Sequence, residues 1–324
     1  MLPIGYREFT LMPKKNNINL TQRTDITNGG ENMNSEYGVL TLAIPKDYKK
    51  AIALSLTLKE HSPTLPISIV CPKNLRQLVA PYFDLVIDER EDLKGFEHKL
   101  YLDQYSPYRN TFFFDADILI LKDIMPIIKQ WSGNAYAVRG HWAQEGISSF
   151  GLNRKYVLEL LKKKSFAVID GAGHAYFEKP ECETVFNACR NIRNEYSIYG
   201  ATKFADEDAV GIALTLLNIS PKENNGFLGS PWCAINNSFK IDTDKSLCSY
   251  EDSLFGKVDP YVVHFPTFAY PFTYARELSK IFRRHNIKVT GLWLQAFKEW
   301  FILRVYWPLL GVRKKIIKIL HFLG

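Results

Sequence analysis

The sequence predicts an α/β fold in which a mainly parallel central sheet is flanked by helices. Short apolar runs rich in strand-forming residues alternate with helical patterns from residue 37 to residue 121. Prolines and polar turn residues separate these runs. The 324 residues are 46% hydrophobic, which is enough to build a core of this kind. Because strands joined through helices usually pair in parallel, the alternation favours βαβ units.

The elements follow one another closely in the first half of the chain. Strand-like runs are bounded by prolines or charged residues, and helical runs carry apolar residues at helical spacing. In chain order we expect a strand at 37–45, a helix at 47–63, a strand at 65–72, a short helix and a strand within 74–89, a helix at 97–107 and a strand at 110–114 that ends at the aspartates, with the apolar run 118–121 beyond it.

The second half of the chain is less regular. Helical patterns lie at 182–193 and 206–218, a loop-rich segment surrounds Gly226, and a late strand is expected at 259–268. These patterns divide the chain into three parts. We expect a flexible lead-in at 1–35, a main domain at 36–275 and a basic amphipathic helical segment at 276–324.

The net charge of +7 is concentrated at one end of the chain. Residues 276–324 contain 11 Lys and Arg against two Glu, a net charge of +9. The other residues hold 30 basic and 32 acidic side chains, a net charge of −2. The main domain therefore shows no charge pattern typical of nucleic-acid binding.

The cysteines and the apolar runs predict a cytoplasmic protein. The five cysteines form no paired motif, which favours free thiols in a reducing compartment. The first 35 residues contain no apolar signal-peptide region. No run approaches the roughly 20 apolar residues that span a bilayer.

Two aspartates follow the apolar run 110–114 directly. Ligands of open α/β sheets bind beyond the carboxyl ends of the strands, which is where Asp115 and Asp117 are expected. Carboxylates two residues apart can share a divalent cation, which can then stabilise a diphosphate leaving group. The D-x-D spacing alone is weak, because Asp206/Asp208 and Asp242/Asp244 repeat it. The apolar strand before it distinguishes the first pair from a solvated strand-end turn.

The segment "YSPYRNTFFFDADILILKDI", with the strand and helix patterns before it, resembles metal-dependent GT-A glycosyltransferases. The nearest type is family 8, the group of glycogenin and bacterial lipopolysaccharide galactosyltransferases, and the resemblance covers roughly residues 37–275. It implies a GT-A fold for nucleotide-diphospho-sugar transfer. It also implies that Asp115 and Asp117 hold Mn²⁺, or Mg²⁺, on the donor diphosphate, with Ala116 at the donor between them.

The family has a downstream segment H-F-x-G-x-x-K-P-W whose histidine completes the metal site. Here "HFPTFAYPF" begins at His264 in the same register. The resemblance therefore makes His264 a metal ligand, although a histidine after "YVV" also fits a packed strand residue. Tyr270 replaces the lysine that contacts the donor phosphates, so Arg276 or Lys280 is expected to supply that charge.

Two further segments resemble the family near the reacting sugar. The family's D-Q-D segment becomes Asp206, Glu207 and Asp208, and a carboxylate at Glu207 could attack the anomeric carbon. The alternative is that Asp206 is a helix N-cap and its neighbours favour the helix N-terminus. "GAGHAYF" resembles the family's N-A-G-V segment, which gives Asp170 a polar role toward sugar hydroxyls, unless the glycines only shape a turn.

The remaining candidate residues contact donor or acceptor by resemblance. Lys99 is expected to reach the donor, unless it is a solvated helix residue. Thr41, Ala43 and Ile44, at the end of the first strand, are expected to border the nucleobase. The acceptor side is assigned to Trp232 and Asn236, although Trp232 also fits a buried loop anchor.

The chain end mixes Trp, Phe and Leu with Arg313, Lys314, Lys315 and Lys318. Basic amphipathic helices of this composition lie on anionic membrane surfaces. Peripheral contact with the inner face of a membrane is therefore one expectation, and a helix docked on the main domain is the other.

Together these features predict a hexosyltransferase that moves a sugar from a nucleotide-diphosphate donor, with UDP as the default, to a glycan or glycolipid acceptor. Retention of anomeric configuration is expected from family likeness alone. Two other classes stay open. A haloacid-dehalogenase-type phosphatase also uses apolar-D-x-D, and a non-catalytic glycan- or membrane-binding relic of the fold fits the replacements at Thr267 and Tyr270.

Overall fold

A computed structural model describes residues 36–306, apart from 172, 202, 224–225 and 267–268, together with residue 308. The predicted lead-in at 1–35, Thr267 and the basic residues at 313–318 lie outside the described residues. All five cysteines are free thiols, as expected.

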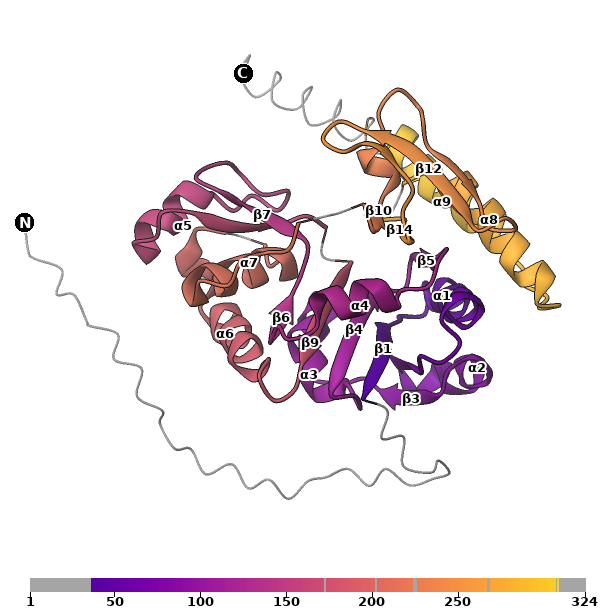
Figure 1. Cartoon of the computed structure of the whole chain (residues 1–324), viewed down its shortest axis with the longest axis horizontal. Helices are drawn as coiled ribbons and strands as arrows, with labels where there is room; N and C mark the ends of the chain where they lie inside the picture. The colour runs from indigo at the N-terminus through magenta and orange to yellow at the C-terminus, as the bar shows by residue number, and fades with distance from the viewer. Residues whose placement is uncertain are drawn as a thin grey trace, which may run out of the picture. The chain divides into compact units, whose positions relative to one another are not determined.

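A six-stranded sheet forms the centre of the fold, in the order β3-β2-β1-β4-β9-β6 (Figure 1). The first four strands run parallel, and β9 is antiparallel to both β4 and β6. The mainly parallel sheet is therefore confirmed. Its strands are β1 (Tyr37–Leu42), β2 (Ile67–Cys71), β3 (Leu85–Asp88), β4 (Asn110–Asp115), β6 (Tyr136–Ala137) and β9 (His174–Glu178).

Helices cover both faces of this sheet and create two apolar cores. The first core lies under α1, α4 and α8, and the second under α5, α6 and α7. The helices are α1 (Tyr48–His61), α2 (Arg76–Val79), α3 (Leu102–Tyr105), α4 (Met125–Trp131), α5 (Arg154–Leu161), α6 (Glu183–Asn194), α7 (Asp206–Leu217), α8 (Pro271–Arg284) and α9 (Leu292–Phe301). Shorter turns are η1 (Lys73–Leu75), η2 (Ala80–Tyr82), η3 (Gly95–Tyr101), η4 (Tyr196–Tyr199), η5 (Pro231–Cys233) and η6 (Ile302–Tyr306).

Strand β4 is buried on both sides, which explains its run of phenylalanines. Phe112 and Phe114 enter the first core, and Phe113 enters the second. Successive side chains of a strand point to opposite faces, so a central strand covered by helices is apolar at every position. The run 110–114 forms β4 as expected, and the apolar residues after Asp117 form β5 (Ile118–Ile120) in another sheet.

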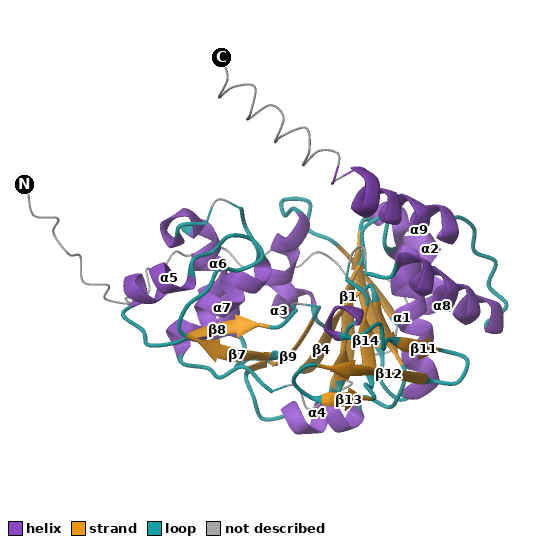
Figure 2. Cartoon of the chain, turned by 90° about the horizontal axis from the view of Figure 1, so that it is seen from above, coloured by secondary structure: helices purple, strands orange, loops and turns teal. Residues whose placement is uncertain are grey.

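Three smaller sheets surround the carboxyl end of the central sheet (Figure 2). They are β10 (Leu228–Gly229) with β14 (Val262–His264) and β5; β11 (Lys240–Asp242) with β12 (Leu247–Asp252) and β13 (Gly256–Val258); and β7 (Gly140–Ala143) with β8 (Phe166–Ile169). Strand β14 realises the predicted late strand, although it is much shorter than 259–268.

The C-terminal helices α8 and α9 pack on the main domain through α1. Glu60 of α1 receives two hydrogen bonds of 2.6 Å from Arg284 of α8. Lys50 of α1 pairs with Glu299 of α9 at 3.6 Å. The described helices are therefore docked, which was one of the two expectations for this segment. Helix α8 spans the boundary that was predicted between residues 275 and 276. The division of the chain into three parts stays a prediction.

Candidate active site

The pairing of β5 with β14 brings His264 to the two aspartates. Asp115 ends β4, and the chain turns at Ala116 before β5 begins. In the antiparallel register of β5 and β14, His264 lies opposite Ile118. The Phe265 backbone N–H also donates to the Asp117 carbonyl oxygen at 2.9 Å. The histidine is therefore fixed beside Asp117 by backbone hydrogen bonds, and not by side-chain contact alone.

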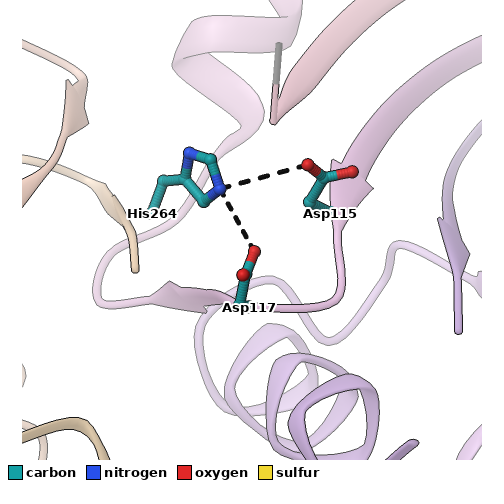
Figure 3. A group of neighbouring side chains, drawn as sticks. All are labelled: Asp115, Asp117 and His264. Atoms are coloured by element: carbon teal, nitrogen blue, oxygen red, sulfur yellow. Dashed lines mark ion pairs between the residues drawn. The ribbon is translucent and has the colours of Figure 1, made fainter. Parts of the chain in front are cut away.

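The three side chains form a compact cluster (Figure 3). His264 Nε2 lies 3.1 Å from Asp117 Oδ1 and 4.0 Å from Asp115 Oδ2. One potential ligand atom from each residue lies within 4.8 Å of the other two. Carboxylate oxygens suit Mn²⁺ and Mg²⁺, and the imidazole nitrogen favours a transition metal such as Mn²⁺ over Mg²⁺. The donor set therefore fits the predicted cation.

Gly173 provides the space for the histidine ring. A Cβ at this position would lie 2.5 Å from His264 Cε1 and 2.6 Å from its Nδ1. The Gly173 carbonyl oxygen also accepts a hydrogen bond of 2.7 Å from the Asp115 N–H. The glycine-rich segment thus contacts both ends of the cluster, a role that sequence patterns did not assign to it.

The two aspartates lie in different electrostatic surroundings. Burial raises the pKa of Asp115, and the Lys99 ammonium offsets only part of this effect. Burial by itself would also raise the pKa of Asp117, but the His264 imidazole, Lys50 and Lys99 outweigh it and lower that pKa. A bound cation favours the ionised form of both groups.

Lys99 joins the cluster to the N-terminus of α7. Its Nζ lies 2.9 Å from Asp115 Oδ1 and 3.1 Å from Asp206 Oδ2. Burial opposes the charge on Lys99, yet the two carboxylates raise its pKa above the ordinary value. Lys99 is therefore a buried, charged bridge and not a solvated helix residue. Two arginines of α6 hold the segment 97–103 that contains Lys99. Arg190 pairs with Asp103, and Arg193 pairs with Glu97.

The first turn of α7 carries three carboxylates with different partners. The N-cap is Ala205, so Asp206 is the first helical residue and the N-cap interpretation of Asp206 is wrong. Asp206 is paired with Lys99, and Asp208 accepts a hydrogen bond of 2.8 Å from Ser148. Burial raises the pKa of Asp208. Glu207 is half-buried and lines the pocket described next.

A pocket of about 1230 Å³ contains the cluster. Eight of the predicted site residues line it: Lys99, Asp115, Asp117, Asp170, Asp206, Glu207, Trp232 and His264. Asp170 is held by His141, whose Nδ1 lies 3.1 Å from the carboxylate. Trp232 is 62% exposed, which contradicts the buried-anchor interpretation.

The other predicted contacts do not line this pocket. Thr41 and Ala43 are buried at the end of β1, Ala116 is buried in the turn after β4, and Ile44 is exposed. Asn236 has a φ of 54° and occupies an exposed turn. The Thr41 hydroxyl is buried and has no hydrogen-bond partner among the described residues.

Arg276 and Lys280, which were expected to replace the lysine missing at Tyr270, do not line the pocket. Tyr270 is the N-cap of α8, and its ring lies 5.5 Å from the Phe239 ring. Arg276 pairs with Glu277, Lys280 pairs with Asp242 and Glu277, and neither lines the pocket. Asp244, the second carboxylate of the third D-x-D, also faces α8 through Arg283.

Lys50 is a functional candidate that sequence reasoning missed. It is 5% exposed, pairs with Asp47 at 3.2 Å, and acts on Asp117 electrostatically. The Tyr274 ring lies 5.8 Å from its Nζ, and the Tyr274 hydroxyl has no hydrogen-bond partner among the described residues. No local signal marks it, because Lys49 and Lys50 stand side by side in the sequence and the carboxylates Asp117 and Glu299 that face Lys50 lie far along the chain.

Comparison with known proteins supports the fold. The sequence matches no protein-family model and no curated protein. Among solved structures, the fold matches the galactosyltransferase LgtC in complex with donor and acceptor sugar analogues, and an active-site mutant of LgtC in which glutamate replaces glutamine. For each of the two structures, the sequence identity is 13% and the TM-score is 0.53. The match covers 80% of this chain and 99% of the LgtC chain. The chain therefore has the GT-A fold of glycosyltransferases.

Proposed function

We propose that this chain is a metal-dependent glycosyltransferase that uses a nucleotide-diphosphate sugar, with UDP as the nucleotide, and a glycan or glycolipid acceptor. The observation that carries the proposal is the cluster of Asp115, Asp117 and His264 at the end of the central strand of a GT-A fold. The LgtC complex, which holds donor and acceptor sugar analogues, supports the two classes of substrate.

Each residue of the site has a separate proposed role. Asp115, Asp117 and His264 would hold Mn²⁺ or Mg²⁺, which supplies positive charge to a diphosphate leaving group. Lys99 keeps Asp115 and Asp206 at fixed positions through its two ion pairs. The buried Thr41 hydroxyl is offered as a partner for the nucleobase, since buried polar groups rarely remain without a hydrogen bond.

Glu207 is the proposed group at the reacting carbon. All three carboxylates of the α7 first turn line the pocket, and Glu207 takes the position of the glutamine in the family's D-Q-D segment. Its carboxylate oxygen would bond to the anomeric carbon as the bond to the diphosphate breaks. The acceptor oxygen would then form a bond to the anomeric carbon and pass its proton to the departing diphosphate, while the bond to the carboxylate breaks, which yields net retention.

The test is thermal unfolding of the full chain with UDP, GDP, CMP and CDP, each with and without Mn²⁺. A ligand that binds the native state alone must raise its stability. We expect a Mn²⁺-dependent rise with UDP that is lost in Asp117→Asn, and sugar transfer from a UDP-sugar that is lost in the same variant. If Asp117→Asn retains wild-type transfer, the assignment is wrong.

We further propose that α9 contacts an anionic membrane surface. Five apolar side chains of α9 are exposed, together with Phe272 of α8. The ring centroids of neighbouring aromatic residues in this group lie 5.8 to 6.4 Å apart. We call this set the aromatic face: Phe272, Trp293, Leu294, Phe297, Trp300 and Phe301. Lys298 lies within it and Arg304 beyond it, in a segment of net charge +9. Aromatic rings with nearby basic residues are typical of interfacial helices.

The two alternative functions, a phosphatase and a non-catalytic relic of the fold, are tested in different ways. The GT-A fold contradicts the haloacid-dehalogenase-type phosphatase. The non-catalytic relic differs from an enzyme only in turnover, so the transfer assay distinguishes the two. Within the described residues, no helix has the length and apolar character that a bilayer span requires.

A further inference from the structure

One end of the pocket is lined by large apolar side chains that are open to solvent. They are Trp232, Ile235, Leu254 and Phe255, with exposed fractions of 62%, 38%, 83% and 49%. We call these four residues the apolar rim. Apolar side chains are costly to leave in water, and their concentration at a functional cavity indicates a binding surface. The rim is continuous with the cavity that holds the metal cluster.

The rim has a shape that is set before any ligand binds. Its two segments, 230–236 and 250–256, are joined by a bridge between Ala234 and Asp252 and by a hydrogen bond of 2.9 Å from the Ile235 N–H to the Glu251 carbonyl. The Asp252 carboxylate accepts hydrogen bonds of 2.7 and 3.3 Å from the N–H groups of Leu254 and Phe255. A preorganised surface loses little conformational entropy on binding.

The rim offers more apolar surface than a sugar needs. A pyranose presents one apolar C–H face, which a single aromatic ring such as Trp232 can cover. Ile235, Leu254 and Phe255 then have no sugar surface to contact. Two of these three side chains are aliphatic, which favours a flexible hydrocarbon chain over a second ring.

The charge of the two rim segments restricts the acceptor further. They carry Glu251 and Asp252 and contain no lysine or arginine. The nearest cation is Arg139, which lines the same pocket and is held by the carbonyl oxygens of Asp170 and Leu228. The four rim side chains are uncharged, so the part of the ligand that they contact is apolar.

We propose that the apolar rim binds the beginning of the hydrocarbon chain of a glycolipid acceptor, whose neutral sugar points into the pocket. This inference rests on the proposed function and narrows its acceptor from a glycan or glycolipid to a lipid-linked sugar. Trp232 covers the sugar face, and Ile235, Leu254 and Phe255 contact the first methylene groups.

The experiment measures equilibrium binding of methyl, phenyl and octyl β-glycosides to the full chain by calorimetry. Galactose, glucose and N-acetylglucosamine are used in parallel, and the octyl compounds are kept below their micelle concentration. For at least one sugar, we expect the octyl glycoside to bind about tenfold or more tightly than the methyl glycoside, because several methylene groups leave water.

Variants test whether this gain comes from the rim. In Leu254→Ser combined with Phe255→Ser, the octyl advantage should fall to about threefold or less. Leu78→Ser is the matched control, because Leu78 is 51% exposed on α2 and does not line the pocket. Unfolding midpoints without ligand check the fold, and Leu254→Ser alone serves if the double variant is unstable.

Three results would overturn the inference: equal binding of methyl and octyl glycosides for every sugar, an octyl advantage that persists in the rim variant, or a larger gain for phenyl than for octyl. None of these requires sugar transfer. Failure of the proposed function would instead appear as the loss of Mn²⁺-dependent nucleotide binding and turnover, so the two failures are distinguishable.

Discussion

Asp115 and Asp117 follow three buried phenylalanines because a central strand is apolar until the point where it leaves the sheet. Phe112, Phe113 and Phe114 fill the two cores in alternation. The carboxylates begin where the helices no longer cover the strand, and Lys99, Lys50 and His264 supply the positive charge that makes their burial tolerable.

At Glu207, the exchange to glutamine removes the negative charge and keeps the size of the side chain. We expect Glu207→Gln to reduce sugar transfer by on the order of 100-fold or more, since a neutral amide is a poor nucleophile. Mn²⁺-dependent UDP binding should be retained, because Glu207 is not in the metal cluster. Transfer at the wild-type rate, with retention preserved, would exclude a nucleophilic role.

At Gly173, a single methyl group tests the packing of the histidine. Alanine suits this backbone, since Gly173 is not among the glycines of positive φ. Its Cβ would nevertheless meet the His264 ring at 2.5 Å. We expect Gly173→Ala to weaken Mn²⁺ binding roughly tenfold or more by moving His264, as measured by a Mn²⁺ titration of nucleotide binding. Unchanged affinity would mean that His264 is not needed for the metal.

At the scale of elements, the sequence predicted the regular parts well. The helices α1, α6 and α7 and the strands β1 to β4 were predicted from apolar runs bounded by prolines or charged residues, whereas α4, α5 and the short strands β6 to β9 were not predicted. The end of the central strand at the aspartates was predicted, but the pairing of the following apolar residues as β5 in a separate sheet was not. The resemblance predicted that His264 lies beside the aspartates. The register of β5 with β14, which places it there, is a tertiary contact that no local sequence pattern encodes.

Side chains whose role depends on distant partners were harder to predict. Arg276 and Lys280 were expected at the donor, yet Glu277 and Asp242 hold them elsewhere. Lys50 was overlooked because its partner Glu299 lies on a helix far along the chain. Ile235 and Leu254 were overlooked because exposed apolar residues are common and carry no signal until a cavity is seen beside them.

The contact between α1 and α8 predicts a pH-dependent contribution to stability. Burial would raise the pKa of Glu60, but hydrogen bonds from Arg284 and His285 outweigh it and lower that pKa below its ordinary 4.5. His61 is the neighbouring titratable group on α1. Because the folded pKa is depressed, the stabilisation is present above pH 4.5 and is lost as pH falls through the folded pKa.

We therefore expect Glu60→Gln to lower the free energy of unfolding by about 1 kcal/mol at pH 7, allowing for partial exposure of the pair. The difference from wild type should narrow below about pH 4.5. Urea unfolding at several pH values measures it, with Glu159→Gln, at an exposed position of α5, as the control. A difference that is independent of pH would contradict the ion-pair explanation.

At the scale of the whole molecule, the aromatic face predicts binding to lipid vesicles. We expect the chain to sediment with vesicles that contain anionic lipid and to bind neutral vesicles more weakly, because basic residues accompany the exposed rings. Trp293→Ser combined with Phe297→Ser should weaken this binding about tenfold or more, since two large apolar groups no longer enter the interface.

Leu78→Ser combined with Leu160→Ser provides the control for that experiment, since both leucines are exposed at other places on the surface. The control should bind vesicles like wild type. If the aromatic-face variant also binds like wild type, α9 is not the contact, and the membrane proposal fails without affecting the transferase proposal.

The docking of α8 and α9 on α1 has a consequence for how the protein is made. Glu60 and Arg284 are separated by 224 residues, so α1 leaves the ribosome long before its partner α8. At a synthesis rate of about 5 to 20 residues per second, the interval is roughly 11 to 45 s. During that time the apolar side of α1 that α8 later covers is open to other nascent chains. We therefore expect this segment to be a binding site for chaperones during translation.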